Sequence, residues 1–180
     1  MTKEIIIGGG CFWCTEAIFQ ELEGIIEVKS GYSGGSIKNP AYREVCTGRT
    51  GHAEVVKISY DNEKISLLNL LIIHLTTHDP TTKDRQGADR GTQYRSVIYY
   101  ADNTEKEIAE QAIVEVQSVY ENPIVTEVSE RVPFFLAEPE HQNYYKNNSE
   151  AGYCQAVINP KLNKFRKLYS THLKAAELKD

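Results

Sequence analysis

The sequence has few of the features that mark membrane, nucleic-acid-binding or disulfide-stabilised proteins. Its richest apolar stretch, Leu67 to Leu75, is interrupted by Asn69 and His74 and is far shorter than a membrane span. Lys and Arg number 20 against 25 Asp and Glu, a net charge of −5, so we expect no basic face for nucleic acid or for a membrane surface. With only 4 cysteines in 180 residues, a disulfide scaffold is also excluded.

The remaining composition fits one globular domain. The chain has 41% hydrophobic residues, enough to bury a sizeable core, and no repeat or linker divides it. The apolar run near the N-terminus, Ile5 to Ile7, is too short for a signal peptide. We therefore expect a single domain over residues 1–180, monomeric and cytoplasmic, with an irregular tail from about residue 131.

Strand and helix patterns alternate along the chain. Strands are expected over 4–8, 25–32, 53–60, 95–101 and 124–129. Helices are expected over 12–22, 65–76, 104–119 and from 160 to about 174, the third with an apolar face of Ile108, Ala112, Val116 and Val119. Long loops over 32–51 and 81–93 have the length of functional loops. This order predicts an open sheet covered by helices, an α/β or α+β sandwich.

A glycine-rich turn delivers one cysteine to the start of a helix. Gly8–Gly10 follow the first strand, and Cys11 comes directly after them. Free N–H groups and the helix dipole favour negative charge there, so a lowered pKa and a thiolate nucleophile are expected for Cys11. Phe12 and Trp13 place large apolar rings beside it. The alternative, that Cys11 and Cys14 are ordinary core residues, is disfavoured because three glycines are an unfavourable way to build a core.

The spacing of the cysteines indicates redox chemistry rather than zinc binding. Cys11 and Cys14 form a C-x-x-C pair, which is typical of redox motifs. A zinc site needs a second such pair, whereas Cys46 and Cys154 stand alone. Cys46 is interpreted as an inert thiol. Cys154 lies in a tail without regular pattern, from which a thiol could travel to another cysteine.

One carboxylate falls on an apolar strand face. With a period of two, Glu54 shares a face with Val56, Ile58 and Tyr60. Burial there would raise the pKa of the carboxyl group and make it a proton donor near neutral pH. The pattern fits equally well a Glu54 that is frayed outward or paired with a basic residue.

The two long loops carry hydrogen-bond donors. Tyr42 lies in the first loop, and Asp89 and Tyr94 lie in the second, where a tyrosine hydroxyl is a good donor for a polarised oxygen. On its own, the second loop would be interpreted as a solvated connection. His74 and His78 could share a helix face, but the glutamate of H-E-x-x-H is missing, so no metal site is predicted.

Together these stretches resemble the A-type peptide methionine sulfoxide reductases over about residues 4–160. The matching segments are Gly9-Gly10-Cys11-Phe12-Trp13, Gly31-Tyr32-Ser33-Gly34-Gly35, Asn39-Pro40-Ala41-Tyr42, Gly51-His52-Ala53-Glu54, His78-Asp79-Pro80-Thr81, Asp84 to Ser96, and Glu140-His141-Gln142-Asn143-Tyr144-Tyr145. The resemblance implies an α+β fold, a two-layer α/β sandwich related to ferredoxin-like folds. It also implies an oxidoreductase, a peptide-methionine (S)-S-oxide reductase, that repairs oxidised methionine, free or in proteins, after oxidative stress. It would use no cofactor, and thioredoxin would be the external dithiol.

The resemblance also implies a role for each site residue. Cys11 would be the nucleophile and Glu54 the acid that protonates the sulfoxide oxygen. The substrate pocket would comprise Phe12 and Trp13 around the S-methyl group, Tyr42 and Tyr94 on the oxygen, and Asp89 as an organising residue. A thiolate and a neutral acid suit this chemistry, because a sulfoxide sulfur is a poor electrophile until its oxygen is protonated.

The regenerating step requires a second thiol. Attack leaves Cys11 as a sulfenic acid, which a thiol converts to a redox-active disulfide that an external dithiol reduces. Cys154 matches the tail cysteine that performs this step in many family members. The family often has glycine where this sequence has Cys14, so Cys14 is a competing or relay thiol, and Cys154 is favoured as the first resolver.

Two other interpretations stay open at this point. A thioredoxin-like thiol–disulfide oxidoreductase also places C-x-x-C at a strand-to-helix turn, but it does not need Glu54 or the tyrosine-bearing loops. A redox-inert binding domain could use the glycines and aromatic residues to hold a peptide. Activity of a Cys14→Ser protein on methionine sulfoxide would count against the first, and oxidation of the protein's own thiols by a sulfoxide, without external reductant, would exclude the second.

Overall fold

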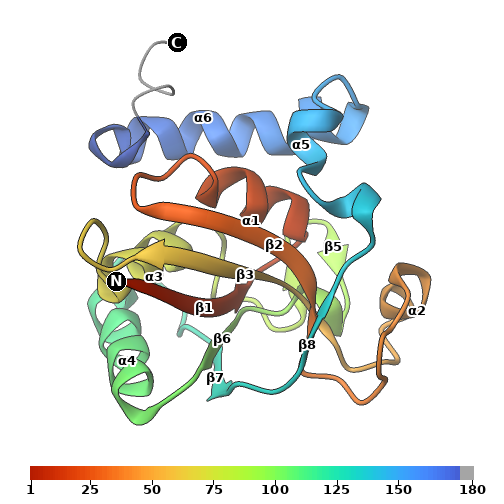
Figure 1. Ribbon diagram of the computed structural model, residues 1–180, viewed down its shortest axis with the longest axis horizontal. Helices are drawn as coiled ribbons and strands as arrows, with labels where there is room; N and C mark the ends of the chain where they lie inside the picture. Colours follow the sequence, from red (N-terminus) through yellow and green to blue (C-terminus); the bar gives the residue numbers. More distant parts are fainter. Residues whose placement is uncertain (175–180) are drawn as a thin grey trace.

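A computed structural model describes residues 1–174, and its centre is a six-stranded sheet (Figure 1). The strands lie in the order β7-β6-β1-β3-β2-β8. Their bounds are β1 (Thr2–Gly8), β2 (Ile25–Ser33), β3 (Ala53–Asp61), β6 (Val97–Tyr100), β7 (Glu127–Glu130) and β8 (Phe134–Leu136). All neighbours are antiparallel except β6 and β7, which are parallel.

Helices lie between the strands and along the tail. They are α1 (Phe12–Phe19), α2 (Tyr42–Cys46), α3 (Leu67–Thr76), α4 (Asn103–Gln117), α5 (Tyr144–Asn147) and α6 (Asn159–Leu168). Short 3-10 turns cover Thr92–Tyr94, Pro139–His141 and Ser170–His172, and a π-helical segment covers Cys154–Ile158. The unit β1-α1-β2-β3-α3-β6 has the strand order β6-β1-β3-β2, so the predicted ferredoxin-like core and α+β class are confirmed.

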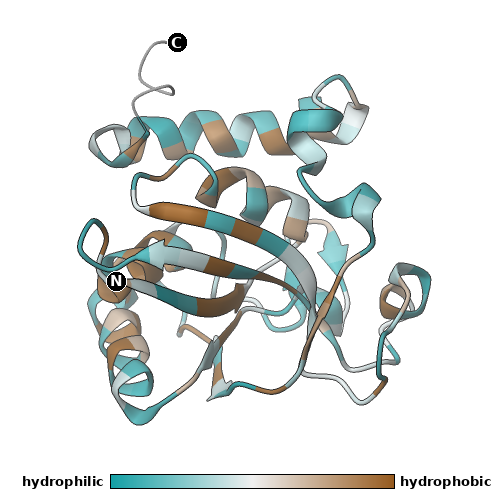
Figure 2. Ribbon diagram, viewed as in Figure 1, coloured by the Kyte–Doolittle hydropathy of each residue, from teal (hydrophilic) through white to brown (hydrophobic). Residues whose placement is uncertain are grey.

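The helices cover one face of the sheet and form the main core with it. Side chains on α1, α3, α4 and α6 join the strand residues Ile5, Ile7, Val56 and Ile58 in one buried cluster. A smaller cluster on the opposite face contains Ile6, Ala53, Val55, Val97 and Tyr99. The alternation of strand side chains between these clusters follows from the period of two. Figure 2 shows the corresponding apolar bands along the strands and the mixed faces of α4 and α6.

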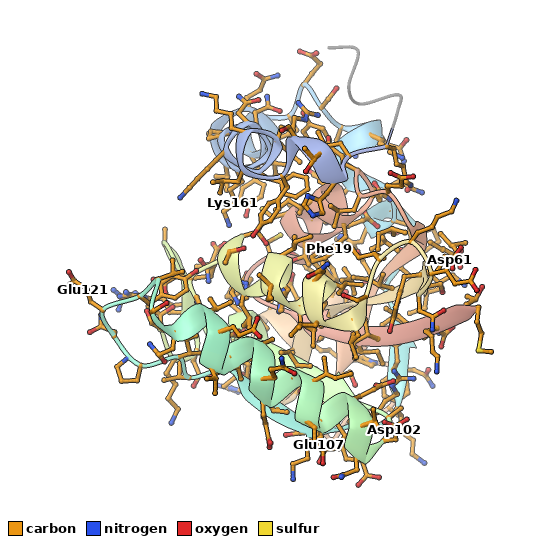
Figure 3. The ribbon with its side chains drawn as sticks, turned by 90° about the vertical axis from the view of Figure 1, so that its left-hand side faces the viewer. Phe19, Asp61, Asp102, Glu107, Glu121 and Lys161 are labelled. Carbon is orange, nitrogen blue, oxygen red and sulfur yellow. The ribbon has the colours of Figure 1, made fainter. Side chains whose placement is uncertain are left out.

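The tail packs back on the first helix. Leu162 and Phe165 of α6 are 1% exposed and belong to the main core. In Figure 3 the labelled Phe19 lies in the interior between α3 and α6, whereas the labelled acids Asp61 and Glu121 lie at the periphery. Within residues 1–174, none of the helices has the length and apolar composition that crossing a membrane requires.

Helix starts follow local capping chemistry. The Ser66 Oγ accepts the Asn69 N–H at 3.1 Å ahead of α3, and the Asp102 carboxylate accepts the Glu105 N–H at 2.9 Å ahead of α4. At its C-terminal end α4 stops at Gln117, so the prediction that Val119 lies on its apolar face is wrong, and Val119 is 67% exposed.

The regions expected to be loops contain short elements. The first long loop holds α2, and the second holds a small hairpin of β4 (Arg85–Gln86) and β5 (Asp89–Arg90). The last predicted helix ends at Leu168 rather than near Lys174. Five-residue and two-residue elements carry too little periodicity for a sequence pattern to reveal them.

Candidate active site

The glycines after β1 allow the chain to pass closely against its neighbours. A Cβ on Gly8 would lie 2.5 Å from the Glu54 carbonyl oxygen, and one on Gly9 would meet the ring of His78 at 2.5 Å. Gly10 has φ +81°, a left-handed conformation that favours glycine, and its N–H donates to the Tyr94 carbonyl oxygen at 3.1 Å. This turn therefore brings Cys11 next to β3 and to the loop that carries Tyr94.

Cys11 is the N-cap residue of α1. Its backbone is extended, with φ −65° and ψ 130°, and the helix begins at the next residue. The residue is 8% exposed, so the sulfur lies just below the surface. The predicted position of the thiol at a helix N-terminus is confirmed.

Glu54 lies directly beside the start of the same helix. Its Oε1 accepts the N–H of Phe12 at 3.1 Å, and the residue is 1% exposed. Its Oε2 is buried and has no hydrogen-bond partner among the described residues. Burial raises the pKa of the Glu54 carboxyl to about 8; the Phe12 N–H opposes this rise, and the nearby charge of Asp89 adds to it. Both predictions for Glu54, the inward face and the raised pKa, are confirmed.

The electrostatic prediction for Cys11 is wrong. Burial raises the pKa of the Cys11 thiol well above its ordinary value, and the neighbouring Glu54 and Cys14 raise it further. A backbone N–H from Trp13 and the hydroxyl of Tyr153 lower the pKa, but they do not offset burial. The helix N-terminus therefore stabilises the thiolate less than the loss of water destabilises it. Because both pKa values are raised, Cys11 and Glu54 are both protonated at neutral pH.

An aromatic wall surrounds the two groups. Phe12 is 1% exposed and Trp13 is half-buried. The Trp13 ring stacks on Tyr144 with centroids 3.7 Å apart and planes inclined by 7°, and its Nε1–H donates to the His141 Nδ1 at 3.1 Å. Tyr42 lies 6.4 Å from Phe12 and 6.5 Å from Trp13, between ring centroids. These rings form an apolar surface beside the thiol.

Two hydroxyl groups face the same region. The pKa values of Tyr42 and Tyr94 are raised, first by burial, and the charges of Glu54 and Cys11 contribute to both shifts. The tyrosines from the two long loops are thus near the thiol and the carboxyl group, as predicted, and both stay protonated. They are hydrogen-bond donors at neutral pH.

The loop that carries Tyr42 is held from two sides. Glu138 accepts the Tyr42 N–H at 3.0 Å through one carboxylate oxygen and the Tyr32 hydroxyl at 3.0 Å through the other. His52 accepts the Gly35 N–H at 3.0 Å, and its other ring nitrogen lies 2.6 Å from the Ile37 carbonyl oxygen. These contacts fix the loop that leads into α2.

Asp89 reaches the site through Tyr153, which the sequence gave no separate reason to single out. The Tyr153 hydroxyl donates to the Asp89 Oδ2 at 3.5 Å and lies 3.9 Å from the Cys14 Sγ. It also lies close enough to Cys11 to lower the pKa of that thiol. A single hydroxyl therefore contacts the Cys14 sulfur and lies near the Cys11 sulfur. The only sequence signal for this residue is its place next to Cys154.

All four cysteines are free thiols. Cys14 lies one turn into α1 and is 3% exposed. Its charge raises the pKa of Cys11, and the charge of Cys154 raises the pKa of Cys14. Cys154 is 0% exposed, and burial raises its pKa. Cys46 is exposed and lies near enough to Tyr42 and Glu54 for them to affect its pKa, although it was interpreted as inert. Cys14 interacts electrostatically with both of the other buried thiols.

The histidines and acids nearby are occupied by hydrogen bonds. The His78 ring contacts the His74 carbonyl oxygen at 2.6 Å and the Ser96 Oγ at 2.7 Å. Ligand atoms of Glu138, Glu140 and His141 lie within 4.8 Å of one another, which is close enough to hold a cation. However, Glu138 and His141 already accept bonds from Tyr32, Tyr42 and Trp13.

Comparison with known proteins points to one family. The family model described as peptide methionine sulfoxide reductase matches residues 3–173. A curated relative from Trichodesmium erythraeum, named peptide methionine sulfoxide reductase MsrA, is 50% identical over 97% of this chain and 100% of its own length. One of the same name from Campylobacter jejuni is 51% identical over 91% of this chain and 98% of its own length.

Solved structures agree. The reduced form of Mxr1 from Saccharomyces cerevisiae matches with TM-score 0.81 and 33% identity, over 85% of this chain and 89% of that one. An unusual oxidised form of Mxr1 matches with TM-score 0.64 and 32% identity, over 83% of each chain. Mxr1 in complex with Trx2 matches with TM-score 0.57 and 25% identity, over 79% of this chain and 84% of that one.

Proposed function

Because the chain belongs to the peptide methionine sulfoxide reductase family, and so is an oxidoreductase, we propose that it reduces methionine-S-sulfoxide, free or in proteins, to methionine. Cys11 is the nucleophile in this proposal, and Glu54 is the proton donor. The observation that carries it is the proximity of the two groups. The Glu54 carboxyl accepts the N–H of Phe12, the residue next to Cys11, and keeps one oxygen without a partner among the described residues.

The first step transfers the sulfoxide oxygen. The Cys11 sulfur attacks the substrate sulfur while Glu54 protonates the oxygen, and a transient sulfur–sulfur bond forms. The hydroxyl group then moves to Cys11 as the substrate's sulfur–oxygen bond and the transient sulfur–sulfur bond break. The oxygen ends on Cys11 as a sulfenic acid, and methionine leaves. The substrate sulfur gains two electrons and Cys11 loses two. The proton lost by the thiol replaces the one that Glu54 gives up, so the step consumes no net proton.

The raised pKa values define which protonation state reacts. The reacting form has a Cys11 thiolate beside a neutral Glu54, and it carries the same number of protons as the form with a thiol beside a carboxylate. Because the two sites are coupled, the limbs of a pH–rate profile belong to the pair rather than to either residue. The lower limb is expected near pH 8, the pKa to which burial raises Glu54, and the upper limb at higher pH.

The pocket selects the substrate by two kinds of contact. Phe12 and Trp13 provide apolar surface for the S-methyl group, and the hydroxyls of Tyr42 and Tyr94 donate hydrogen bonds to the oxygen. Asp89 organises this side of the site through the Tyr153 hydroxyl. A pocket with the methyl site and the oxygen site fixed relative to the thiol accepts one epimer at sulfur, consistent with one enzyme for each epimer.

Cys154 resolves the sulfenic acid in this proposal. Its thiol attacks the Cys11 sulfur, a disulfide forms, and water is released. Cys14 is a competing or relay thiol, which its electrostatic interaction with both Cys11 and Cys154 supports. Thioredoxin then supplies two electrons to the disulfide, and the Mxr1–Trx2 complex supports that partner. The enzyme thereby repairs methionine residues oxidised under oxidative stress, without a prosthetic group.

We place this activity in one catalytic domain that includes the tail. The tail supplies His141, Tyr144, Tyr153 and Cys154 to the site. Its last helix contributes Leu162 and Phe165 to the same core as α1. Removing the tail is therefore expected to expose the main core as well as to remove the resolving thiol.

The decisive experiment is one turnover without external reductant. The fully reduced protein is mixed with one equivalent of methionine-S-sulfoxide, or of the R epimer as the matched control, and methionine and thiol states are quantified by mass spectrometry. We expect one methionine per protein, with a Cys11–Cys154 disulfide, from the S epimer only. No methionine, or equal yields from both epimers, would contradict the proposal.

Two variants assign the thiols in the same assay. Cys154→Ser is expected to stop at a Cys11 sulfenic acid; a disulfide in full yield would transfer the resolving role to Cys14. Cys14→Ser is expected to keep reducing the sulfoxide. Loss of reduction in Cys14→Ser would favour the thiol–disulfide oxidoreductase that the C-x-x-C spacing alone allows.

A further inference from the structure

A second buried carboxylate lies on α1, outside the reacting groups. Glu16 is 1% exposed. Its Oε2 accepts the Ser30 hydroxyl at 3.2 Å, and its Oε1 accepts the backbone N–H of Tyr144 at 3.1 Å. The backbone N–H of Asn143 lies close enough to lower the pKa of the same carboxyl group. Glu16 therefore joins α1, strand β2 and the tail at one point.

The tail residues that Glu16 binds lead directly to the aromatic wall. Asn143 has φ 54°, in the left-handed region, and Tyr144 follows it as the first residue of α5. The Tyr144 ring stacks on Trp13 at 3.7 Å between centroids. A left-handed backbone is less favourable for asparagine than for glycine, although asparagine tolerates it better than most residues. The bond from the next N–H, that of Tyr144, to Glu16 holds the chain directly after this conformation.

We propose that Glu16 is a positioning residue for substrate recognition: by holding the Tyr144 N–H it fixes the Tyr144 ring against Trp13. The indole then keeps the place where the proposed function puts the S-methyl group of the substrate. The inference rests on that function for its meaning, but the contact between Glu16, Tyr144 and Trp13 is independent of it.

A separate set of bonds keeps the tail attached when Glu16 is changed. The Ser30 N–H donates to the Gln142 Oε1 at 3.0 Å, and the Gln142 Nε2 donates back to the Ser30 carbonyl oxygen at 2.8 Å. The Ala137 N–H reaches the same carbonyl at 3.0 Å. Removing the Glu16 carboxylate is thus expected to free the Tyr144 ring without detaching the tail.

The chain offers a spectroscopic probe of this contact, because Trp13 is its one tryptophan. We expect Glu16→Ala to make Trp13 fluorescence about twofold more accessible to acrylamide quenching and to raise the KM for a methionine sulfoxide peptide about tenfold, with kcat within about twofold of wild type. Glu16→Gln should restore both, since its amide oxygen can accept the Tyr144 N–H and its amide nitrogen can donate to the Ser30 hydroxyl.

A matched control separates this effect from the loss of any buried acid near α1. Glu21 is 6% exposed and binds the Arg166 guanidinium at 3.0 Å, on the other part of the tail. Glu21→Ala is expected to lower stability while leaving the quenching of Trp13 and the KM unchanged. Equal changes in Glu21→Ala and Glu16→Ala would reduce Glu16 to a merely structural role and overturn the proposal.

A double-mutant cycle tests the route through Tyr144. Tyr144→Ala should reproduce the Glu16→Ala changes, and the double variant Glu16→Ala with Tyr144→Ala should be no worse than Tyr144→Ala alone. Additive effects would overturn the proposal. If Glu16→Ala does not fold, Tyr144→Ala decides by itself, because unchanged quenching and KM there would refute the link.

The two proposals fail in different ways. If the wild-type protein reduces no sulfoxide, the proposed function is lost, whereas the quenching changes in the Glu16 and Tyr144 variants still report on the stack. If sulfoxide reduction is robust and quenching is unchanged, only the positioning role is lost.

Discussion

Glu54 and Glu16 are both 1% exposed and both contact the region around α1, but their surroundings differ. Glu16 receives the Ser30 hydroxyl on one oxygen and the Tyr144 backbone N–H on the other, so both of its oxygens are bound. Glu54 receives only the Phe12 N–H, and its second oxygen has no partner in residues 1–174. Buried polar atoms are normally satisfied, so an exception asks for an explanation.

The difference separates a structural carboxylate from a reactive one. Burial raises the pKa of both carboxyl groups. At Glu16 the N–H groups of Asn143 and Tyr144 and the Ser30 hydroxyl oppose the rise. At Glu54 the Phe12 N–H opposes it, and the pKa reaches about 8. An acid that is neutral at pH 7 and has a free oxygen can give its proton to a ligand. The number of hydrogen-bond donors, rather than burial itself, therefore distinguishes the two roles.

The largest expected effect is on catalysis. Glu54→Gln should slow the reduction of methionine sulfoxide by about 10²- to 10⁴-fold, the contribution typical of general acid catalysis. Glu16→Gln, the matched change at the satisfied carboxylate, should keep kcat within about twofold of wild type. Single-turnover rates of methionine release measure both. Equal losses of rate in the two variants would show that Glu54 has no catalytic role beyond that of a buried carboxyl group.

The next effect is on the pH dependence of stability. The folded-state pKa of Glu54, about 8, lies above its ordinary value of 4.5, so the folded protein binds more protons than the unfolded chain between those pH values. Its favourable contribution is therefore complete below pH 4.5 and is lost as the pH rises through about 8. Glu54→Gln should gain stability relative to wild type across this window, by at most about 1.4 kcal/mol per pH unit.

Urea unfolding at pH 5 and pH 8 checks this prediction. Glu16→Gln serves as the control, because it also removes a buried acid whose pKa is raised. A stability difference between wild type and Glu54→Gln that stays constant from pH 5 to pH 8 would show that Glu54 is already ionised in the folded protein.

A smaller effect is expected on the thiol. The charge of Glu54 is the second cause, after burial, of the raised pKa of Cys11. Glu54→Gln should therefore lower the pKa of Cys11, although burial keeps it above its ordinary value. Titration of thiolate absorbance, with a Cys11→Ser protein subtracted as background, measures the shift. An unchanged or higher Cys11 pKa in Glu54→Gln would mean that the two groups do not interact.

Sequence patterns predicted the parts of the site that local chemistry determines. The period of two placed Glu54 on the face of Val56 and Ile58, because strand side chains alternate whatever the rest of the chain does. The glycine turn before Cys11 likewise follows from local backbone freedom. The strand order could be anticipated only through the family resemblance.

The rest depends on contacts between distant segments. The pKa of Cys11 was predicted in the wrong direction because a sequence shows the helix N-terminus but not the depth at which the sulfur lies. Tyr144 and Tyr153 come from a tail without periodicity, so no local pattern predicted their contacts with Trp13 and the Cys14 sulfur. In the sequence, nothing distinguishes Glu16 from the other acidic residues of the chain.

The proposed reaction requires that Glu54 holds a proton at neutral pH, and this protonation can be measured. Infrared difference spectra between wild type and Glu54→Gln, recorded from pH 5 to pH 10, isolate the carboxyl band of this residue. We expect the band of a neutral carboxylic acid at pH 7, and this band should disappear with a midpoint near pH 8. A carboxylate band already complete at pH 6 would contradict it, because an ionised Glu54 has no proton to give.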